Sequence, residues 1–170
     1  NKTQDLNTKK YIKSLNATIS IQSDPEKVDL QRVEQLFKRT NQFNNAHNRY
    51  SLLEIRNFVS KKIIYTLDYK DNINTASETA AVIIINKKER FISDFLMSCR
   101  FFSRGLEFVF LQFIIKLDSS STKIDSIFIN RNDKNKVFQD FIDKFIISND
   151  SNKIAELKNI NSLKNYSNEY

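Results

Sequence analysis

The chain has one cysteine, Cys99, which begins a run of seven residues that also holds two arginines and the only glycine of the chain. A thiolate is the side-chain nucleophile best suited to carrying a thioester. Guanidinium groups close to a thiol favour the thiolate, and they also bind phosphate or carboxylate groups. Cys99, Arg100 and Arg104 therefore form a candidate acyl-acceptor and anion-binding site.

A second interpretation makes Cys99 a residue of the core. Residues 91–99 are patterned as a β-strand, and strict alternation along it places Cys99 on the same face as Phe95 and Met97. A buried free cysteine usually behaves as a small, inert hydrophobic side chain. The residue pattern leaves both interpretations open.

A polar segment, residues 40–44, follows a predicted helix and contains Asn41, Gln42 and Asn44. Asparagine side chains at a helix end can replace glycine in capping the chain. His47 is the single histidine and lies in a predicted loop, where it could act as a general base. One histidine and one cysteine that are far apart in sequence predict no metal site.

The composition is that of a folded globular protein. The chain has 170 residues, of which 40% are hydrophobic and 28% are charged. No apolar stretch approaches the roughly 20 residues needed to cross a bilayer, so we expect no membrane association. The formal charge of +7 suits an acidic partner or a phosphorylated small-molecule substrate. Basic residues do not cluster with aromatic ones, which makes nucleic acid an unlikely partner.

A single cysteine rules out an internal disulfide and fits a reducing compartment, so we expect a cytoplasmic protein.

Hydrophobic periodicity predicts an alternation of strands and helices. Strands are expected at 17–22, 63–69, 80–85, 91–99 and 124–129, and helices at 24–41, 51–61, 106–117 and 137–146. Ser51 and Glu54 have the spacing of a capping box, which marks the start of the second helix. Three successive strands in the middle form an antiparallel meander. The order predicts a mixed α+β fold with a central, mostly antiparallel sheet flanked by helices.

The polar residues 1–14 are expected to form a lead-in or linker before a single domain at 15–170. The tail at 149–170 is weakly patterned, and we expect it to hold a last edge strand or no regular element.

Three segments resemble the C-terminal GNAT-like domain of FkbH-like proteins (HAD-superfamily subfamily IIIC), in which a HAD-type phosphatase domain precedes it. The segments are RVEQLFKRTNQFN at 32–44 with RYS at 49–51, FLMSCR at 95–100 with RGLE at 104–107, and KNKV at 134–137 with DF at 140–141. The resemblance implies the GNAT-like acyltransferase fold. Family members take a glyceryl unit from bisphosphoglycerate, remove its phosphate and load the unit on an acyl carrier protein in polyketide extender-unit biosynthesis.

The resemblance also implies site residues and a cofactor. Cys99 would be the catalytic residue. The residues that would bind the substrate or its anionic groups are Asn41, Gln42, Asn44, Arg49, Tyr50, Arg100, Ser103, Arg104 and Gly105. In the GNAT-like fold, the loop and helix after the meander bind the pyrophosphate of coenzyme A. Residues 100–105 match the first and last positions of its Arg/Gln-x-x-Gly-x-Gly/Ala pattern, with Ser103 at the first glycine. Coenzyme A or a phosphopantetheine arm is the implied cofactor.

Two functions follow as hypotheses. The first is transfer of a glyceryl or other acyl unit to an acyl carrier protein. The second is a non-catalytic GNAT-like domain for docking or dimerisation. In both, a HAD-type phosphatase domain is a partner in the same or a separate chain, because this chain contains no Asp-x-Asp-x-Thr/Val motif.

Overall fold

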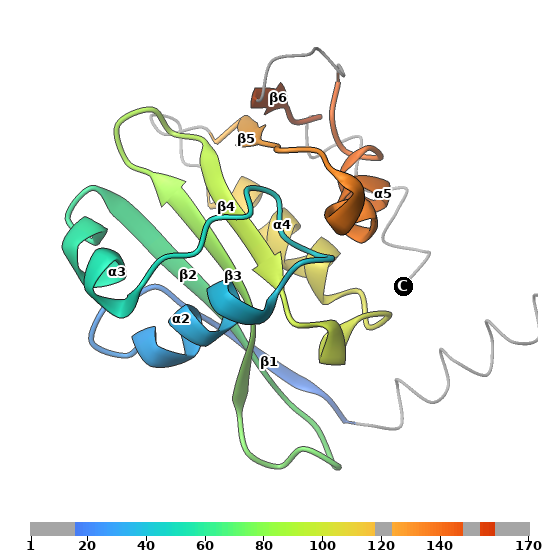
Figure 1. Cartoon of the computed structure of the whole chain (residues 1–170). Coiled ribbons are helices and arrows are strands. Elements are labelled where there is room, and N and C mark those ends of the chain that lie inside the picture. The colour runs from blue at the N-terminus through green and yellow to red at the C-terminus, as the bar shows by residue number, and fades with distance from the viewer. Residues whose placement is uncertain (1–15, 118–123, 148–153, 159–170) are drawn as a thin grey trace, which may run out of the picture.

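The fold is built on one six-stranded sheet, which the computed structural model describes together with its helices over residues 16–117, 124–147 and 154–158 (Figure 1). The strands lie in sequence order and are β1 (Thr18–Gln22), β2 (Lys62–Lys70), β3 (Glu78–Asn86), β4 (Ile92–Met97), β5 (Ser126–Phe128) and β6 (Ile154–Glu156). All neighbouring pairs are antiparallel except β4 and β5, which are parallel. The predicted α+β class with a mostly antiparallel sheet is confirmed.

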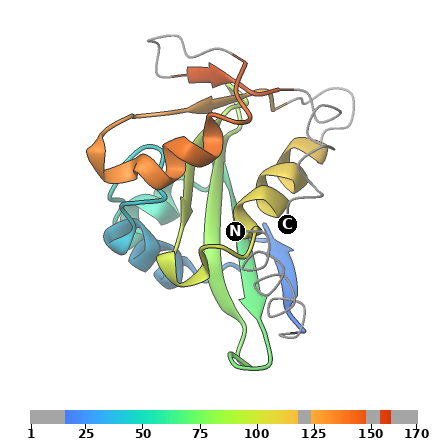
Figure 2. The same cartoon turned by 90° about the vertical axis from the view of Figure 1, so that its right-hand side faces the viewer.

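Helices cover both faces of the sheet. α2 (Leu30–Arg39) and α3 (Leu52–Phe58) lie on one face, and α4 (Leu106–Lys116) lies on the other (Figure 2). A short 3-10 helix, η1 (Cys99–Phe101), follows β4 directly. A second one, η2 (Asp133–Asn135), leads into α5 (Lys136–Ile142). The helices predicted at 51–61 and 106–117 are therefore present, with α3 shorter than expected.

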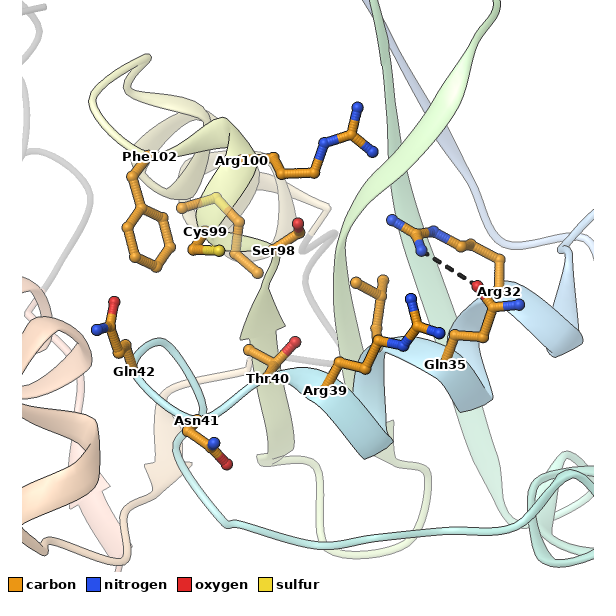
Figure 3. A pocket seen from close by; sticks show the side chains of 12 residues that line it. Arg32, Gln35, Arg39, Thr40, Asn41, Gln42, Ser98, Cys99, Arg100 and Phe102 are labelled. Atoms are coloured by element: carbon orange, nitrogen blue, oxygen red, sulfur yellow. Dashed lines mark hydrogen bonds between the residues drawn. The ribbon is translucent and has the colours of Figure 1, made fainter.

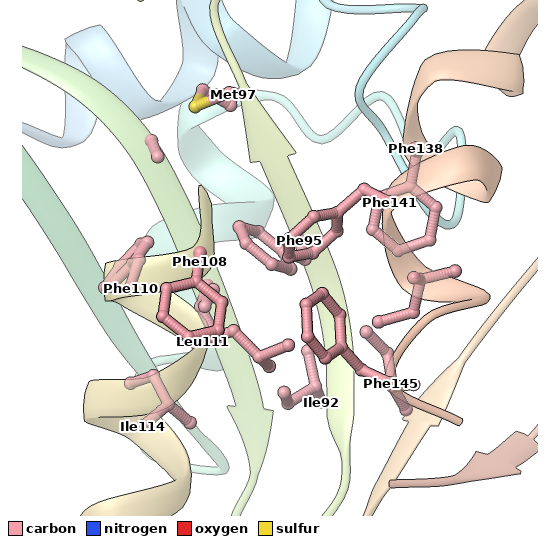
Figure 4. Close-up of a cluster of buried hydrophobic side chains, with 14 of the residues drawn as sticks. Ile92, Phe95, Met97, Phe108, Phe110, Leu111, Ile114, Phe138, Phe141 and Phe145 are labelled. Atoms are coloured by element: carbon pink, nitrogen blue, oxygen red, sulfur yellow. The ribbon is translucent and has the colours of Figure 1, made fainter. Parts of the chain in front are cut away.

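Alternation along the central strands divides the core into two clusters. In β3, Ile83 belongs to the cluster on the α4 side, whereas Ile84 belongs to the cluster against α2 and α3. The α4 side is rich in phenylalanine: Phe95 of β4 makes edge-to-face contacts with Phe138 and Phe141 of α5 (Figure 4). Each buried phenylalanine contributes about 1.5–3 kcal/mol of hydrophobic stabilisation. The same cluster contains Phe108, Phe110 and Leu111 of α4, which explains why this helix is largely buried.

The first helix begins later than its sequence predicts. The carbonyl of Asp24 accepts from the amides of Lys27 and Val28, which makes a separate turn after β1. The helix then begins at Leu30, because the side chain of Asp29 caps it by accepting from the amide of Arg32. At α3 the predicted capping box of Ser51 and Glu54 is present in both directions.

The strand predicted at 91–99 ends at Met97, two residues early. The amide of Ser98 still donates to Ala80 of β3, at 2.9 Å, but the chain then turns into η1. The alternation that would bury Cys99 therefore stops before it, and its side chain is exposed. The core interpretation of Cys99 is wrong.

The C-terminal part differs in detail from the prediction. α5 ends at Ile142, although Phe145 and Ile146 remain buried just beyond it. Within the predicted tail, β6 forms the expected edge strand beside β5. The predicted lead-in at 1–14 and most of the tail lie outside the described residues. Among the helices that are described, none has the length and apolar character that crossing a membrane requires.

Candidate functional site

The edge of β4 on the side of β5 determines from which direction a ligand can reach the candidate site. β4 pairs with β5 only at Ile92 and Ile127. Farther along β4, its edge is paired instead by the segment Phe43–Asn45, which precedes α3. The amide of Met97 donates to the carbonyl of Phe43 at 3.0 Å, and the amide of Asn45 donates to the carbonyl of Phe95 at 3.2 Å. The segment Phe43–Asn45 therefore occupies the edge of β4 on the side of β5.

Buried amide side chains hold this segment in place. Asn45 accepts from the amide of Phe95 at 2.6 Å and donates to the carbonyls of Ser93 and Phe128. The side chain of Asn135, at the end of η2, donates to the carbonyl of Asn44 at 2.9 Å. Buried polar groups are stable only when such partners are supplied. Asn44 and Asn45 are thus structural residues.

A pocket of about 400 Å³ lies between α2 with the residues that follow it and the end of β4 with the turn after it. Its lining residues come from these two regions: Arg32, Gln35, Leu36, Arg39, Thr40, Asn41, Gln42, Met97, Ser98, Cys99, Arg100 and Phe102. In Figure 3, Cys99 lies on one side of the pocket and Thr40 and Gln42 lie on the opposite side, with the side chain of Asn41 beside them pointing away from Cys99. Four of the predicted site residues, Asn41, Gln42, Cys99 and Arg100, are brought together here.

The pocket is strongly cationic. Arg32, Arg39 and Arg100 line it, and the lining residues include no aspartate, glutamate or histidine. One carboxylate behind the lining, Glu78 of β3, pairs with Arg32 and Arg100. The structure records no hydrogen-bond or ion-pair partner for the exposed Arg39 among the described residues. An exposed thiol in such a pocket can meet an anionic ligand, because the guanidinium groups attract it.

Three predicted binding residues lie behind the pocket. Asn44 is fully buried, with its side chain bonded to the backbone of residues 40, 46 and 47. The guanidinium of Arg49 donates to the carbonyls of Phe37 and Thr40 and to the side chain of Asn41. It therefore caps the end of α2 and orients a pocket residue. The ring of Tyr50 packs between Phe37 and Phe58, and burial raises the pKa of its hydroxyl above the usual range.

Residues 103–105, in the loop between η1 and α4, also lie outside the pocket. Ser103 has a φ of 63° and Gly105 a φ of 70°, so both adopt the left-handed conformation. Ser103 therefore has the backbone conformation that a glycine would adopt at its position, despite its Cβ. The guanidinium of Arg104 stacks over the rings of Tyr69 and Phe101, at 4.8 and 5.3 Å from their centroids. Arg104 is therefore not among the residues that line the pocket with Cys99, and its predicted role in anion binding stays a prediction.

Two other polar groups have structural explanations. His47 does not line the pocket, and its pKa is lowered mainly by burial and further by the charges of Arg49 and Lys134. The glycine-free turn after β2 is closed by Asp71, which accepts from the amides of Ile73 and Asn74. These bonds lower the pKa of Asp71 and replace the conformational freedom of a glycine.

Sequence reasoning missed Arg32, Gln35 and Arg39 as pocket residues. Their spacing of i, i+3 and i+7 puts them on one helix face, which is the signal that could have grouped them. That signal becomes informative only when the end of β4 is known to face α2.

Comparison with solved structures identifies the architecture. The plant protein NAA60 of Arabidopsis thaliana, in complex with a bisubstrate analogue, matches with a TM-score of 0.54 and 13% identity, over 82% of this chain and 96% of that one. A mutant spermidine N-acetyltransferase SpeG of Vibrio cholerae matches with a TM-score of 0.52 and 9% identity, over 81% and 90%. AtaTR bound with AcCoA matches with a TM-score of 0.52 and 16% identity, over 89% and 98%. This chain has the GNAT N-acetyltransferase fold.

Identities of 9 to 16% show that the fold is shared, but they give no information about a substrate of this chain. No protein-family model matches the chain, and no curated protein matches it either. The GNAT-like part of the predicted resemblance is thus supported, while the FkbH-like association stays a prediction.

The GNAT fold implies coenzyme A, and the residues of this chain fit it only in part. The left-handed Ser103 and Gly105 lead into α4, whose first amides have no partner within the helix and suit an anion. An extended arm with amide groups would pair with the edge of β4, however, and the amides of Phe95 and Met97 already donate to Asn45 and Phe43. Coenzyme A lying along β4 does not fit this chain.

Proposed function

We propose that this domain transfers a small, negatively charged acyl unit, with Cys99 as the acyl acceptor. The observation that carries the proposal is the exposed thiol in a pocket lined by three arginines. The GNAT fold of the domain is compatible with acyl transfer in general. The donor best suited to the pocket is an acyl phosphate such as bisphosphoglycerate, because its phosphate groups complement the guanidinium groups.

The reaction has two acyl-transfer steps, and in each a C–S bond forms at the acyl carbon as another bond to that carbon breaks. The Cys99 thiolate attacks the carbonyl carbon of the acyl phosphate, the C–O bond to phosphate breaks, and inorganic phosphate leaves with the bonding pair. The thiol of a phosphopantetheine arm then loses its proton to solvent and attacks the thioester, the C–S bond to Cys99 breaks, and Cys99 is released as the thiolate. Arg39 and Arg100 bind the oxyanion of the substrate, while the side chains of Asn41 and Gln42 hydrogen-bond its hydroxyl and carbonyl groups.

An acyl carrier protein is the proposed second substrate. Its arm reaches Cys99 from the open side of the pocket, since the edge of β4 is closed by Phe43–Asn45. A carrier protein is acidic, and the basic charge of this chain, +7, favours its encounter. A HAD-type phosphatase domain, in the same or another chain, would remove the remaining phosphate of the glyceryl unit.

Intact-mass measurement tests the proposal. The chain is incubated with bisphosphoglycerate generated in place, with and without a carrier protein and a phosphatase. We expect an adduct that is released by hydroxylamine, is absent from Cys99→Ala and persists in Ser98→Ala, a neighbouring pocket residue. Absence of any adduct on a folded chain whose Cys99 reacts with iodoacetamide would rule out the transfer.

The second candidate is a non-catalytic docking domain of the same fold. The observation that favours it is the pocket lining, which offers no aspartate, glutamate or histidine as a general base. For this candidate, the carrier protein or phosphatase binds the chain with equal affinity before and after Cys99→Ala, and no adduct forms.

A further inference from the structure

Glu78 stands at the centre of the charged groups around the pocket. It is the first residue of β3, and its Oε1 lies 2.6 Å from Nη2 of Arg32 and 3.0 Å from Nη1 of Arg100. Its Oε2 lies 3.1 Å from the same nitrogen of Arg100. One carboxylate thus connects an arginine of α2 with an arginine of η1, the two regions between which the pocket opens.

The pairing leaves Arg32 incompletely satisfied. Its Nη1 donates to Gln35 at 3.2 Å and its Nη2 to Glu78, while its Nε is buried and has no hydrogen-bond partner. A guanidinium binds a carboxylate or phosphate best through two parallel N–H groups. Glu78 engages only one nitrogen of each arginine, so it is a weaker partner than an oxyanion that could use both.

The three side chains differ in their exposure to solvent. Arg32 is 19% exposed and Glu78 26%, whereas Arg100 is 61% exposed. Arg100 is therefore the most accessible of the three to a ligand. Arg32 is less exposed and is also bonded to Gln35 of the same helix.

We propose that Glu78 is the internal counter-ion of this pocket, and that it occupies Arg32 and Arg100 until an oxyanion of the substrate replaces it. The proposal rests on the anion-binding role of the pocket in the proposed function and does not depend on acyl transfer. The ligand class is a small molecule with a phosphate monoester or a carboxylate.

Glu78 would then determine which oxyanions are accepted. A carboxylate that replaces Glu78 exchanges one single charge for another and gains little. A phosphate monoester carries a charge of about −1.5 to −2 at pH 7, so it gains from the same exchange. The wild-type pocket therefore prefers phosphate to carboxylate. Removing the charge of Glu78 removes the same displacement cost for both classes, so both bind more tightly and carboxylates become detectable ligands.

Alkylation of Cys99 measures the charge of the pocket directly. Iodoacetate is an anion and iodoacetamide is neutral, and the ratio of their rates cancels the thiolate fraction of Cys99. In Glu78→Gln we expect the ratio of the iodoacetate rate to the iodoacetamide rate to rise roughly tenfold, because the negative charge that pairs with Arg32 and Arg100 of the pocket lining is lost. Glu26→Gln, which makes the same change in net charge at a residue outside the pocket, should leave the ratio unchanged.

Protection by added ions distinguishes the two ligand classes. Inorganic phosphate should slow the alkylation of the wild type more than acetate does. Both ions should protect Glu78→Gln at lower concentrations than the wild type, because neither has to displace Glu78 there. Glu78→Asp keeps the charge and should keep the wild-type ratio. Equal ratios in the wild type and a folded Glu78→Gln would overturn the proposal. If the rate ratio rises in Glu78→Gln but the wild type forms no acyl adduct, the role of Glu78 as counter-ion is supported and the proposed acyl transfer is ruled out.

Discussion

Asn45→Ala is the substitution that tests the closed edge of β4 most directly. The Asn45 side chain is fully buried and makes three hydrogen bonds. It accepts from the amide of Phe95 at 2.6 Å, and it donates to the carbonyl of Ser93 at 3.1 Å and to that of Phe128 at 2.7 Å. Truncation to alanine removes all three bonds and leaves three backbone groups short of a partner.

The expected loss follows from these groups. A buried donor or acceptor without a partner costs about 1–3 kcal/mol, and a carbonyl that keeps a second partner costs less. For the Phe95 amide and the two carbonyls together we expect a loss of roughly 3–5 kcal/mol in the free energy of unfolding. That is a large part of the about 5–15 kcal/mol typical of a whole domain.

Urea denaturation followed by circular dichroism measures this loss as a lower midpoint at unchanged slope. The matched control is Asn41→Ala, the same truncation of an exposed asparagine whose side chain accepts from Arg49. We expect it to cost at most about 1 kcal/mol. Equal losses of unfolding free energy in the two variants would refute the stabilising role of the Asn45 side chain. The backbone hydrogen bonds of residues 43 and 45 would then be what stabilises the edge of β4.

Three further substitutions test other features through the same urea midpoints. Ser103→Gly should raise stability by at most about 1 kcal/mol, because the left-handed conformation costs an L-residue about 1–2 kcal/mol and glycine loses about 0.5–1 kcal/mol in chain entropy; a lower midpoint would contradict this account. Arg49→Met should cost about 1–3 kcal/mol by leaving the carbonyl of Phe37 without this partner at the end of α2, whereas the carbonyl of Thr40 keeps its bond from Asn44, and a neutral effect would count against the cap. Burial raises the pKa of Asp94 above its unfolded value, so its proton is held more tightly in the folded state, and wild-type stability falls relative to Asp94→Asn as the pH rises above about 4. A difference between the two chains that is independent of pH would contradict the raised pKa.

The helices and strands were predictable where their signals are local. Ser51 and Glu54 mark the start of α3 by themselves, and the apolar run of α4 needs no distant information. The errors occur where a competing local bond decides the boundary. The Asp24 turn delays α2, and η1 ends β4 before Cys99.

The site was predictable only in part, for a different physical reason. Polar segments next to Cys99 and after α2 could be recognised as candidates, and Asn41, Gln42 and Arg100 do line the pocket. Arg32 and Arg39 could not be distinguished from a solvated helix face. An arginine has the same sequence signal whether it faces water or a thiol about 60 residues later. Conversely, Asn44 is polar in sequence but buried in the fold.

The contacts of the segment Phe43–Asn45 also bear on the order in which the chain folds. Its side-chain bonds join residues that are 50, 83 and 91 positions apart in sequence. Contacts of such long separation form late, because a large loop must close before they are gained. During synthesis, residues 16–117 would leave the ribosome without the partners at Phe128 and Asn135. Strands β1 to β4 therefore reach their final stability only after η2 has emerged. Until then, the edge of β4 lacks the hydrogen bonds of Asn45 to Phe128 and of Asn44 to Asn135.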